Sequence, residues 1–84
     1  MNIRDIGTKL HEAGLRNLYT KVAAADYWMP ACAAEATYVV TSRGSESCAD
    51  LEAIVRAAGF TVVRSFVQGL EQGRNNDAVC LFNV

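Results

Sequence analysis

Proline, histidine and tryptophan each occur only once in this sequence, and no long uncharged apolar run is present. A membrane-spanning helix needs about 18 consecutive apolar residues, and no window of the chain approaches that length, so we expect no membrane contact. Arg4, Asp5 and Lys9 interrupt the apolar region that a secretory signal peptide would require near the N-terminus. The sequence therefore predicts neither a membrane span nor a signal peptide.

Cysteine is scarce as well. The three cysteines, Cys32, Cys48 and Cys80, are odd in number and widely spaced, and they form neither a zinc-binding pattern nor a disulfide framework. Reduced thiols of this kind are typical of proteins in the cytosol. We therefore predict a cytoplasmic protein that holds no metal or other cofactor.

Neither sign of charge is in excess, because eight Lys and Arg residues face nine Asp and Glu residues, for a net charge of −1. Domains that bind nucleic acid through phosphate contacts carry a basic stripe, so we expect no direct nucleic-acid binding. The sole histidine, His11, has no Ser–His–Asp or two-carboxylate pattern around it that would support acid–base catalysis. These features predict that the chain is not an enzyme and that its partner is a protein.

The N-terminal part shows helical spacing. Asn2 is a suitable N-cap, and Gly14 is suited to end the helix that follows. Apolar residues recur at helical spacing again over 15–29, up to the helix-breaking Pro30. We therefore predict a helix pair, or one long helix bent near Gly14.

An alternative for this part is an internal duplication. Residues 2–22 align with residues 47–67, and a duplicated helix–hairpin unit would place a strand at about 16–23. The 15–22 segment lacks the alternation and the β-branched residues typical of strands. The helix is therefore the favoured prediction, and the strand stays as the alternative.

The rest of the chain predicts strands around one helix. Residues 37–41 and 60–67 are rich in β-branched and aromatic residues, and 78–82 is an apolar final strand. Between the first two, Ser47 begins a helix with Asp50 at the third helical position, in a variant of the capping box. If 78–82 forms a hairpin with 60–67, it lies between 60–67 and 37–41.

The predicted fold is accordingly a single α+β domain over residues 1–84. An N-terminal helix or helix pair is followed by β-α-β-β. The strands form a small three-stranded sheet, with four strands as the alternative, that helices cover on one face.

Residues 41–48 read Thr-Ser-Arg-Gly-Ser-Glu-Ser-Cys and lead into the predicted helix, after which Gly59-Phe60 opens the next strand. This layout resembles the first strand–loop–helix–strand unit of the glutaredoxins, in which a Gly-Cys-x-x-Cys loop stands at the helix N-terminus. Ser45 occupies the place of that family's nucleophilic cysteine, and Cys48 matches the second cysteine. The sole proline, Pro30, precedes the unit, so the family's later cis-proline has no counterpart. The resemblance implies thiol chemistry that would rest on Cys48 alone.

Two kinds of segment are candidates for partner binding. The first is a corner before Pro30, because Trp and Tyr are enriched in binding hot spots and Met adapts to irregular surfaces; for Trp28 the alternative is a core position. The second is polar loops and a hairpin tip. The predicted partner-binding residues are Tyr27, Trp28, Met29, Arg43, Glu46, Arg74 and Asn75.

The favoured functional hypothesis is a non-catalytic protein-binding module. The small size of the chain and its lack of catalytic motifs are typical of small inhibitors or adaptors of phages and mobile elements. These include anti-CRISPR-like proteins that block a surface of a host defence complex. Two alternatives remain open. One is a degenerate glutaredoxin-like thiol-redox protein using Cys48; the other is a self-associating structural subunit, such as a homodimer, that pairs through strand 37–41 or around Trp28.

Overall fold

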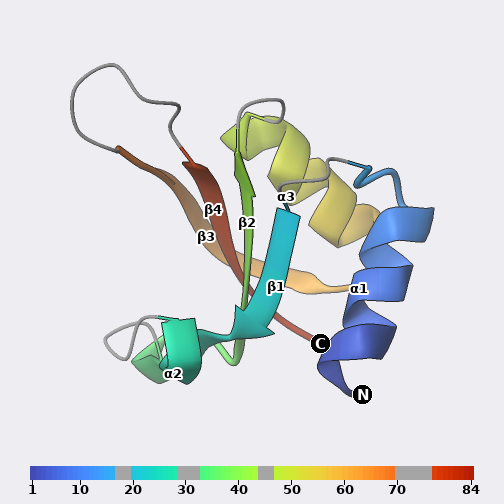
Figure 1. Ribbon diagram of the computed structural model, residues 1–84, viewed down its shortest axis with the longest axis horizontal. Helices are drawn as coiled ribbons and strands as arrows, with labels where there is room; N and C mark the ends of the chain where they lie inside the picture. The colour runs from blue at the N-terminus through green and yellow to red at the C-terminus, as the bar shows by residue number, and fades with distance from the viewer. Residues whose placement is uncertain (17–19, 29–32, 44–46, 70–76) are drawn as a thin grey trace.

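The chain folds into a four-stranded antiparallel sheet with helices on both sides of it (Figure 1). The computed structural model describes residues 1–16, 20–28, 33–43, 47–69 and 77–84, and for Tyr27 and Trp28 only the backbone. The elements in chain order are α1 (Ile3–Glu12), β1 (Thr20–Ala24), α2 (Ala25–Trp28), β2 (Tyr38–Arg43), α3 (Cys48–Ala57), β3 (Thr61–Gln68) and β4 (Asp77–Asn83). In the described parts of the chain, no helix is long and apolar enough to cross a membrane.

Helix α1 begins and ends where the sequence predicts. The Asn2 side chain accepts a hydrogen bond from the Asp5 N–H at 2.9 Å, which satisfies one of the unpaired donors of the first turn. Ile6 and Leu10, one turn apart, are fully buried. Gly14 follows the helix with φ +120°, a conformation that side chains with a Cβ rarely adopt.

Helix α3 is built in the same way. The Ser47 hydroxyl accepts a hydrogen bond from the Asp50 N–H at 3.1 Å, which confirms the predicted cap. Leu51 and Val55 are fully buried, and Gly59 ends the element with φ +91°. The capping residues and the apolar spacing therefore specify both long helices locally.

The predicted helix over 15–29 is wrong for most of its described part. Residues Thr20–Ala24 form β1, an edge strand paired with β2, and only Ala25–Trp28 is helical. The alternative with a strand near 16–23 is closer to the structure. Val22 pairs with Val40 and packs against the core. Pairing with a neighbouring strand thus overrides the weak strand propensity of this segment.

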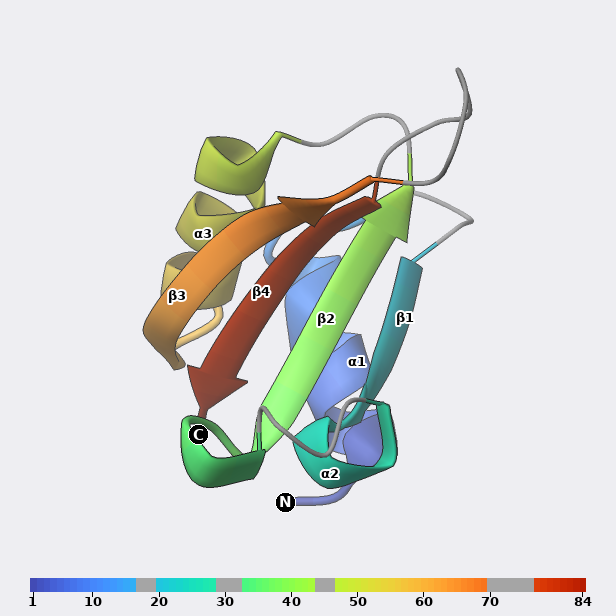
Figure 2. The same cartoon turned by 90° about the vertical axis from the view of Figure 1, so that its left-hand side faces the viewer.

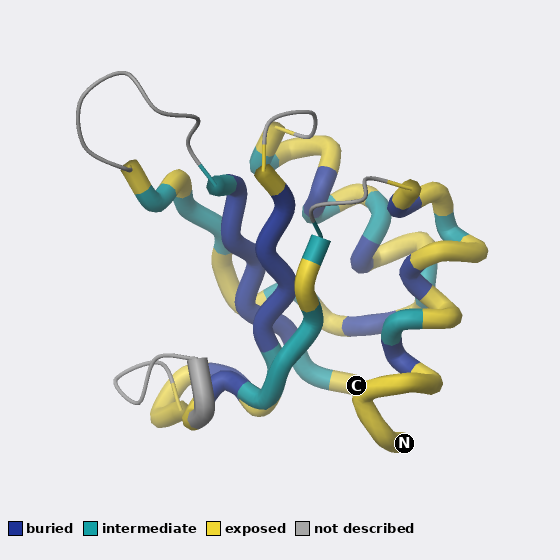
Figure 3. The backbone as a smooth tube through the Cα atoms, in the orientation of Figure 1, coloured by how far each residue is buried: buried dark blue, intermediate teal, exposed yellow. Residues whose placement is uncertain are grey.

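The sheet order is β1-β2-β4-β3, with every pair antiparallel (Figure 2). Strand β4 lies between β2 and β3, as the sequence predicts, and β1 is the fourth strand, which corresponds to the four-stranded alternative. Five consecutive residues of β4, Ala78–Phe82, are buried, because both faces of this central strand are covered (Figure 3).

The two faces of the sheet carry separate clusters of buried residues. On one face, which we call the helix face, α1 and α3 pack against Val40, Cys80 and Phe82. On the other face, Val39, Val79 and Leu81 pack with Ala25 of α2 and with Ala36. The prediction that helices cover one face holds for α1 and α3, whereas the short α2 lies at one end of the opposite face (Figure 2).

We call this opposite face the open face, because Lys21, Arg43 and Arg64 on it are exposed, although Val39, Val79 and Leu81 at its centre are buried. Paired residues of an antiparallel ladder point to the same side of the sheet, and successive residues alternate. From the pairing registers, the open face is formed by Lys21 and Ala23 of β1, Val39, Thr41 and Arg43 of β2, Thr61, Arg64, Phe66 and Gln68 of β3, and Asp77, Val79, Leu81 and Asn83 of β4.

Candidate functional site

The predicted partner-binding residues are not gathered into one cluster by the described structure. Tyr27 and Trp28 belong to α2, which begins next to Thr37, before the first residue of β2. Arg43 is the last residue of β2, at the opposite end of that strand. The other four, Met29, Glu46, Arg74 and Asn75, lie outside the described residues.

Arg43 is part of an ion pair at one end of the open face. Its Nε donates to Asp77 Oδ1 at 3.0 Å, and the two residues are direct partners in the ladder between β2 and β4. Opposite charges at such positions stabilise strand pairing. The Arg43 side chain is 48% exposed and that of Asp77 is 20% exposed, so the cation is the more accessible member of the pair.

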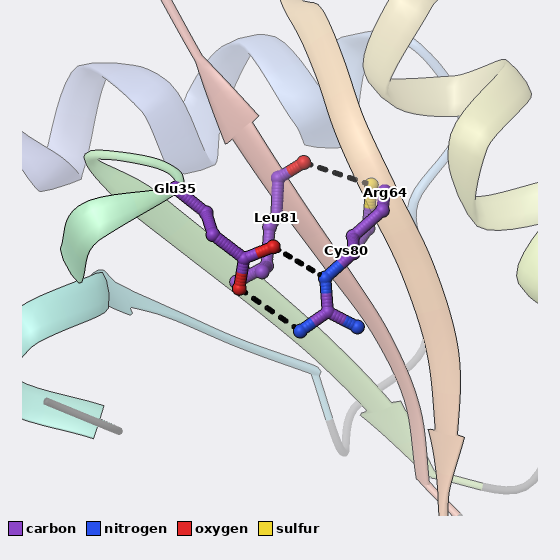
Figure 4. Close-up of polar contacts among 4 residues, drawn as sticks. All are labelled: Glu35, Arg64, Cys80 and Leu81. Carbon is purple, nitrogen blue, oxygen red and sulfur yellow. Dashed lines mark hydrogen bonds and ion pairs between the residues drawn. The ribbon is translucent and has the colours of Figure 1, made fainter. Parts of the chain in front are cut away.

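A second arginine on the same face is held more firmly. Arg64 donates from Nε to Glu35 Oε1 at 2.7 Å and from Nη2 to Glu35 Oε2 at 3.0 Å, a bidentate pair that ties β3 to the segment before β2 (Figure 4). The hydrogen bond from Arg64 lowers the pKa of the Glu35 carboxyl group below its ordinary value, and the positive charge of Arg64 acts in the same direction. The guanidinium carbon also lies 4.8 Å from the centroid of the Phe66 ring.

Arg64, Phe66 and Glu35 are not among the partner-binding residues predicted from the sequence. The alternation of residues along 61–68 contains a signal for two of them, because Arg64 and Phe66 stand two positions apart and so share a face. Glu35 has no comparable signal, since its contact with Arg64 joins residues 29 positions apart in the sequence.

On the helix face, polar and thiol groups from α3, β3 and β4 come together. The Ser65 hydroxyl donates a short hydrogen bond to Glu52 Oε2, while Glu52 Oε1 pairs with Arg56 Nη2 at 3.1 Å one helical turn away. The bond from Ser65 and the contact with Arg56 lower the pKa of Glu52, so its carboxylate is a weak base. These contacts fasten α3 to β3.

The thiols near this cluster differ in burial. Cys80 is fully buried, and burial, with a contribution from the negative charge of Glu52, raises its pKa to about 12. A thiol with this pKa is protonated at neutral pH and is a poor nucleophile. Cys48, the first residue of α3, is half-buried and packs against the same core. Ser45, which the glutaredoxin resemblance places at the nucleophile position, lies outside the described residues.

A shallow groove of about 210 Å³ separates the C-terminal ends of α1 and α3, lined by Lys9, Glu12, Ala13, Ala57 and Ala58. Sites for drug-sized molecules are typically ~300 Å³ or larger. Within the described ranges, no three His, Cys, Asp or Glu side chains are grouped so that they could hold a metal ion.

The open face is therefore the surface where exposed charge and an aromatic ring meet in a defined geometry. Comparison of the chain with protein-family models, with curated proteins and with solved structures finds no match to any of them.

Proposed function

We propose that this chain is a non-catalytic protein-binding module that acts in the cytoplasm by covering a surface of a partner protein with the open face. The observation that carries this proposal is the pair of carboxylate-held arginines on that face, one of which lies over Phe66. Arg and aromatic residues are the types most enriched in binding hot spots.

The ion pairs prepare the two arginines for binding. A side chain that is already fixed in place loses less conformational entropy when a partner orders it. Arg43 and Arg64 are held by Asp77 and Glu35, yet each arginine side chain remains 48% exposed. The guanidinium groups are thus positioned but accessible.

The charges on the open face favour a partner with exposed carboxylates. Lys21, Arg43 and Arg64 lie on this face, and the acidic members of the two pairs, Glu35 and Asp77, are less exposed than the arginines that they hold. Nucleic acid is a less favourable partner, because binding to phosphates calls for a basic stripe, whereas this chain carries eight basic and nine acidic residues. An acidic protein surface with an apolar contact for Phe66 fits better.

The class of protein follows from size and composition. A chain of 84 residues with a net charge near zero suits a small inhibitor or adaptor of the phage or mobile-element type, including an anti-CRISPR-like protein that blocks a host defence complex. Arg43 belongs both to the sequence-based set of partner-binding residues and to this surface.

The test is affinity capture from lysate of the source cells with three baits. These are the wild type, Arg43→Gln/Arg64→Gln, and the control Arg4→Gln/Arg16→Gln, which removes two exposed arginines outside the open face. We expect one complex to be retained by the wild type and the control and to be lost by the open-face variant. The captured host complex, purified separately without the bait, should then lose its own activity when the wild-type chain is added. Equal retention by all three baits, or no retention by any, contradicts the proposal.

A further inference from the structure

We propose that β3 pairs with the β3 strand of a second copy of this chain, so that two four-stranded sheets join into one across a two-fold axis. Strand β3 is the longest of the sheet, with eight residues, and it forms an edge, since β4 is its one neighbour among the strands of the described residues. An edge strand presents a row of backbone donors and acceptors that another strand can satisfy.

The direction of these backbone groups follows from the ladder. The Ala25 N–H donates to the Thr37 carbonyl oxygen at 2.9 Å, in the same register as the pairing of β1 with β2. Backbone groups alternate in direction along a strand, so those of the next residue, Tyr38, point toward β4 and its partner Phe82. Those of Phe82 point back toward β2, and those of the preceding residue, Leu81, point toward β3.

The same alternation continues into β3. Leu81 is the partner of Arg64, so the backbone groups of Arg64 and of Phe66 point toward β4. The N–H and C=O groups of Ser65 and Val67 consequently point away from the sheet. Ser65 and Val67 are two residues apart, which is the spacing that an added antiparallel strand requires.

The side chains along this edge suit self-pairing. The β-bulge between Val62 and Arg64 limits the regular part of the strand to Arg64–Gln68. Within it Val67 is 56% exposed, and the single charge, on Arg64, is already paired with Glu35. The other edge strand, β1, is five residues long and carries the exposed Lys21, a residue type that natural edge strands use to prevent pairing.

One two-fold register pairs the outward backbone groups of Ser65 and Val67 and also keeps like charges apart. If the axis passes through Phe66, Ser65 of each copy stands opposite Val67 of the other, and their outward backbone groups form the new hydrogen bonds. The two Phe66 rings then meet on the open face at a non-hydrogen-bonded position, where side chains are closest. Arg64 stands opposite Gln68 of the second copy, so no like charges meet.

The pairing of two short strands buries little area. Stable interfaces bury about 1,200 Å² or more, and this contact is smaller, so we expect a reversible dimer with a dissociation constant in the micromolar range or weaker. The dimer is therefore a property to be measured as a function of protein concentration.

Sedimentation velocity from micromolar to millimolar concentration is the first test, with the variants Val67→Lys and Val84→Lys. These valines are matched in exposure, at 56% and 57%, but Val84 lies outside β3. We expect the wild type and Val84→Lys to shift from monomer to dimer as concentration rises, and Val67→Lys to remain monomeric with an unchanged circular dichroism spectrum. A wild type that stays monomeric at millimolar concentration, or a Val67→Lys variant that still dimerises, overturns the proposal.

Amide hydrogen exchange identifies the strand directly. The Val67 amide should become protected only as concentration rises, whereas the Phe66 amide, which points toward β4, should be protected at every concentration. Protection of Val67 that does not change with concentration contradicts an intermolecular strand pair. Both measurements are made without any partner protein, so their outcome is separate from that of the proposed function.

Discussion

The stacked rings around Phe82 give a quantitative test of how the helix face is held together. Phe82 is fully buried in β4, and its ring centroid lies 5.8 Å from that of Tyr38 and 5.5 Å from that of Phe60. Each such aromatic pair contributes about 0.5–1.5 kcal/mol beyond the burial of its area. Phe82→Leu keeps an apolar side chain but removes both pairs, so it should lower the free energy of unfolding by about 1–3 kcal/mol.

This loss is large for a chain of this size. At ~0.05–0.15 kcal/mol per residue, the whole domain is stable by roughly 4–13 kcal/mol. Urea denaturation followed by circular dichroism measures the change, and the midpoint should fall while the slope with denaturant stays the same.

Phe66→Leu on the open face is the matched control. Phe66 is half-buried, and its ring lies beneath the Arg64 guanidinium, a contact worth about 0.5–1 kcal/mol. If Phe82→Leu destabilises the protein no more than Phe66→Leu does, the stacked rings around Phe82 add no stability to the fold beyond that of one ring–guanidinium contact.

Two further predictions concern titratable groups. Iodoacetamide at pH 8 should leave Cys80 unlabelled in the folded protein and label it after denaturation, because burial raises its pKa to about 12; rapid labelling of the native thiol in mass spectrometry would contradict this. Glu35 has a lowered pKa in the folded protein, so the stability that its pair with Arg64 contributes is present above the unfolded pKa of about 4.3 and is lost as pH falls through the folded value. Thermal melts should therefore show the wild type more stable than Glu35→Gln at pH 7 and the two equally stable at strongly acidic pH. A stability difference that grows on acidification would contradict a lowered pKa of Glu35 in the folded protein.

The parts of the fold that the sequence predicts are those specified by neighbouring residues. Asn2 with Asp5 and Ser47 with Asp50 form helix caps whose members are three positions apart, and both caps are present in the structure. The strands 61–68 and 77–83 likewise carry their β-branched and apolar residues in one short stretch.

The error at β1 has a physical cause. Thr20–Ala24 contains Lys21, Ala23 and Ala24, which have good helix propensity, and the segment becomes a strand because its backbone pairs with β2 about twenty residues later. A pattern read over a short window does not contain that information.

The candidate surface was only partly predictable for the same reason. Arg43 could be selected as a residue of the polar loop predicted after strand 37–41, and the structure places it at the end of β2. Its pairing with Asp77 and that of Arg64 with Glu35 depend on the order of the strands, since these residues are 34 and 29 positions apart. Met29, Glu46, Arg74 and Asn75 lie outside the described residues.

The central position of β4 has a consequence for the synthesis of the protein. Strands β2 and β3 do not pair with each other, and both are joined to the sheet through β4. Until residues 77–83 have emerged from the ribosome, the growing chain can form its helices and the pairing of β1 with β2, but β3 has no strand to pair with. The backbone edges of β2 and β3 that pair with β4 in the folded protein are then both unpaired. The sheet must therefore close only when β4 inserts between β2 and β3, and the interval before that step is when the nascent chain is most exposed to aggregation or to capture by a chaperone.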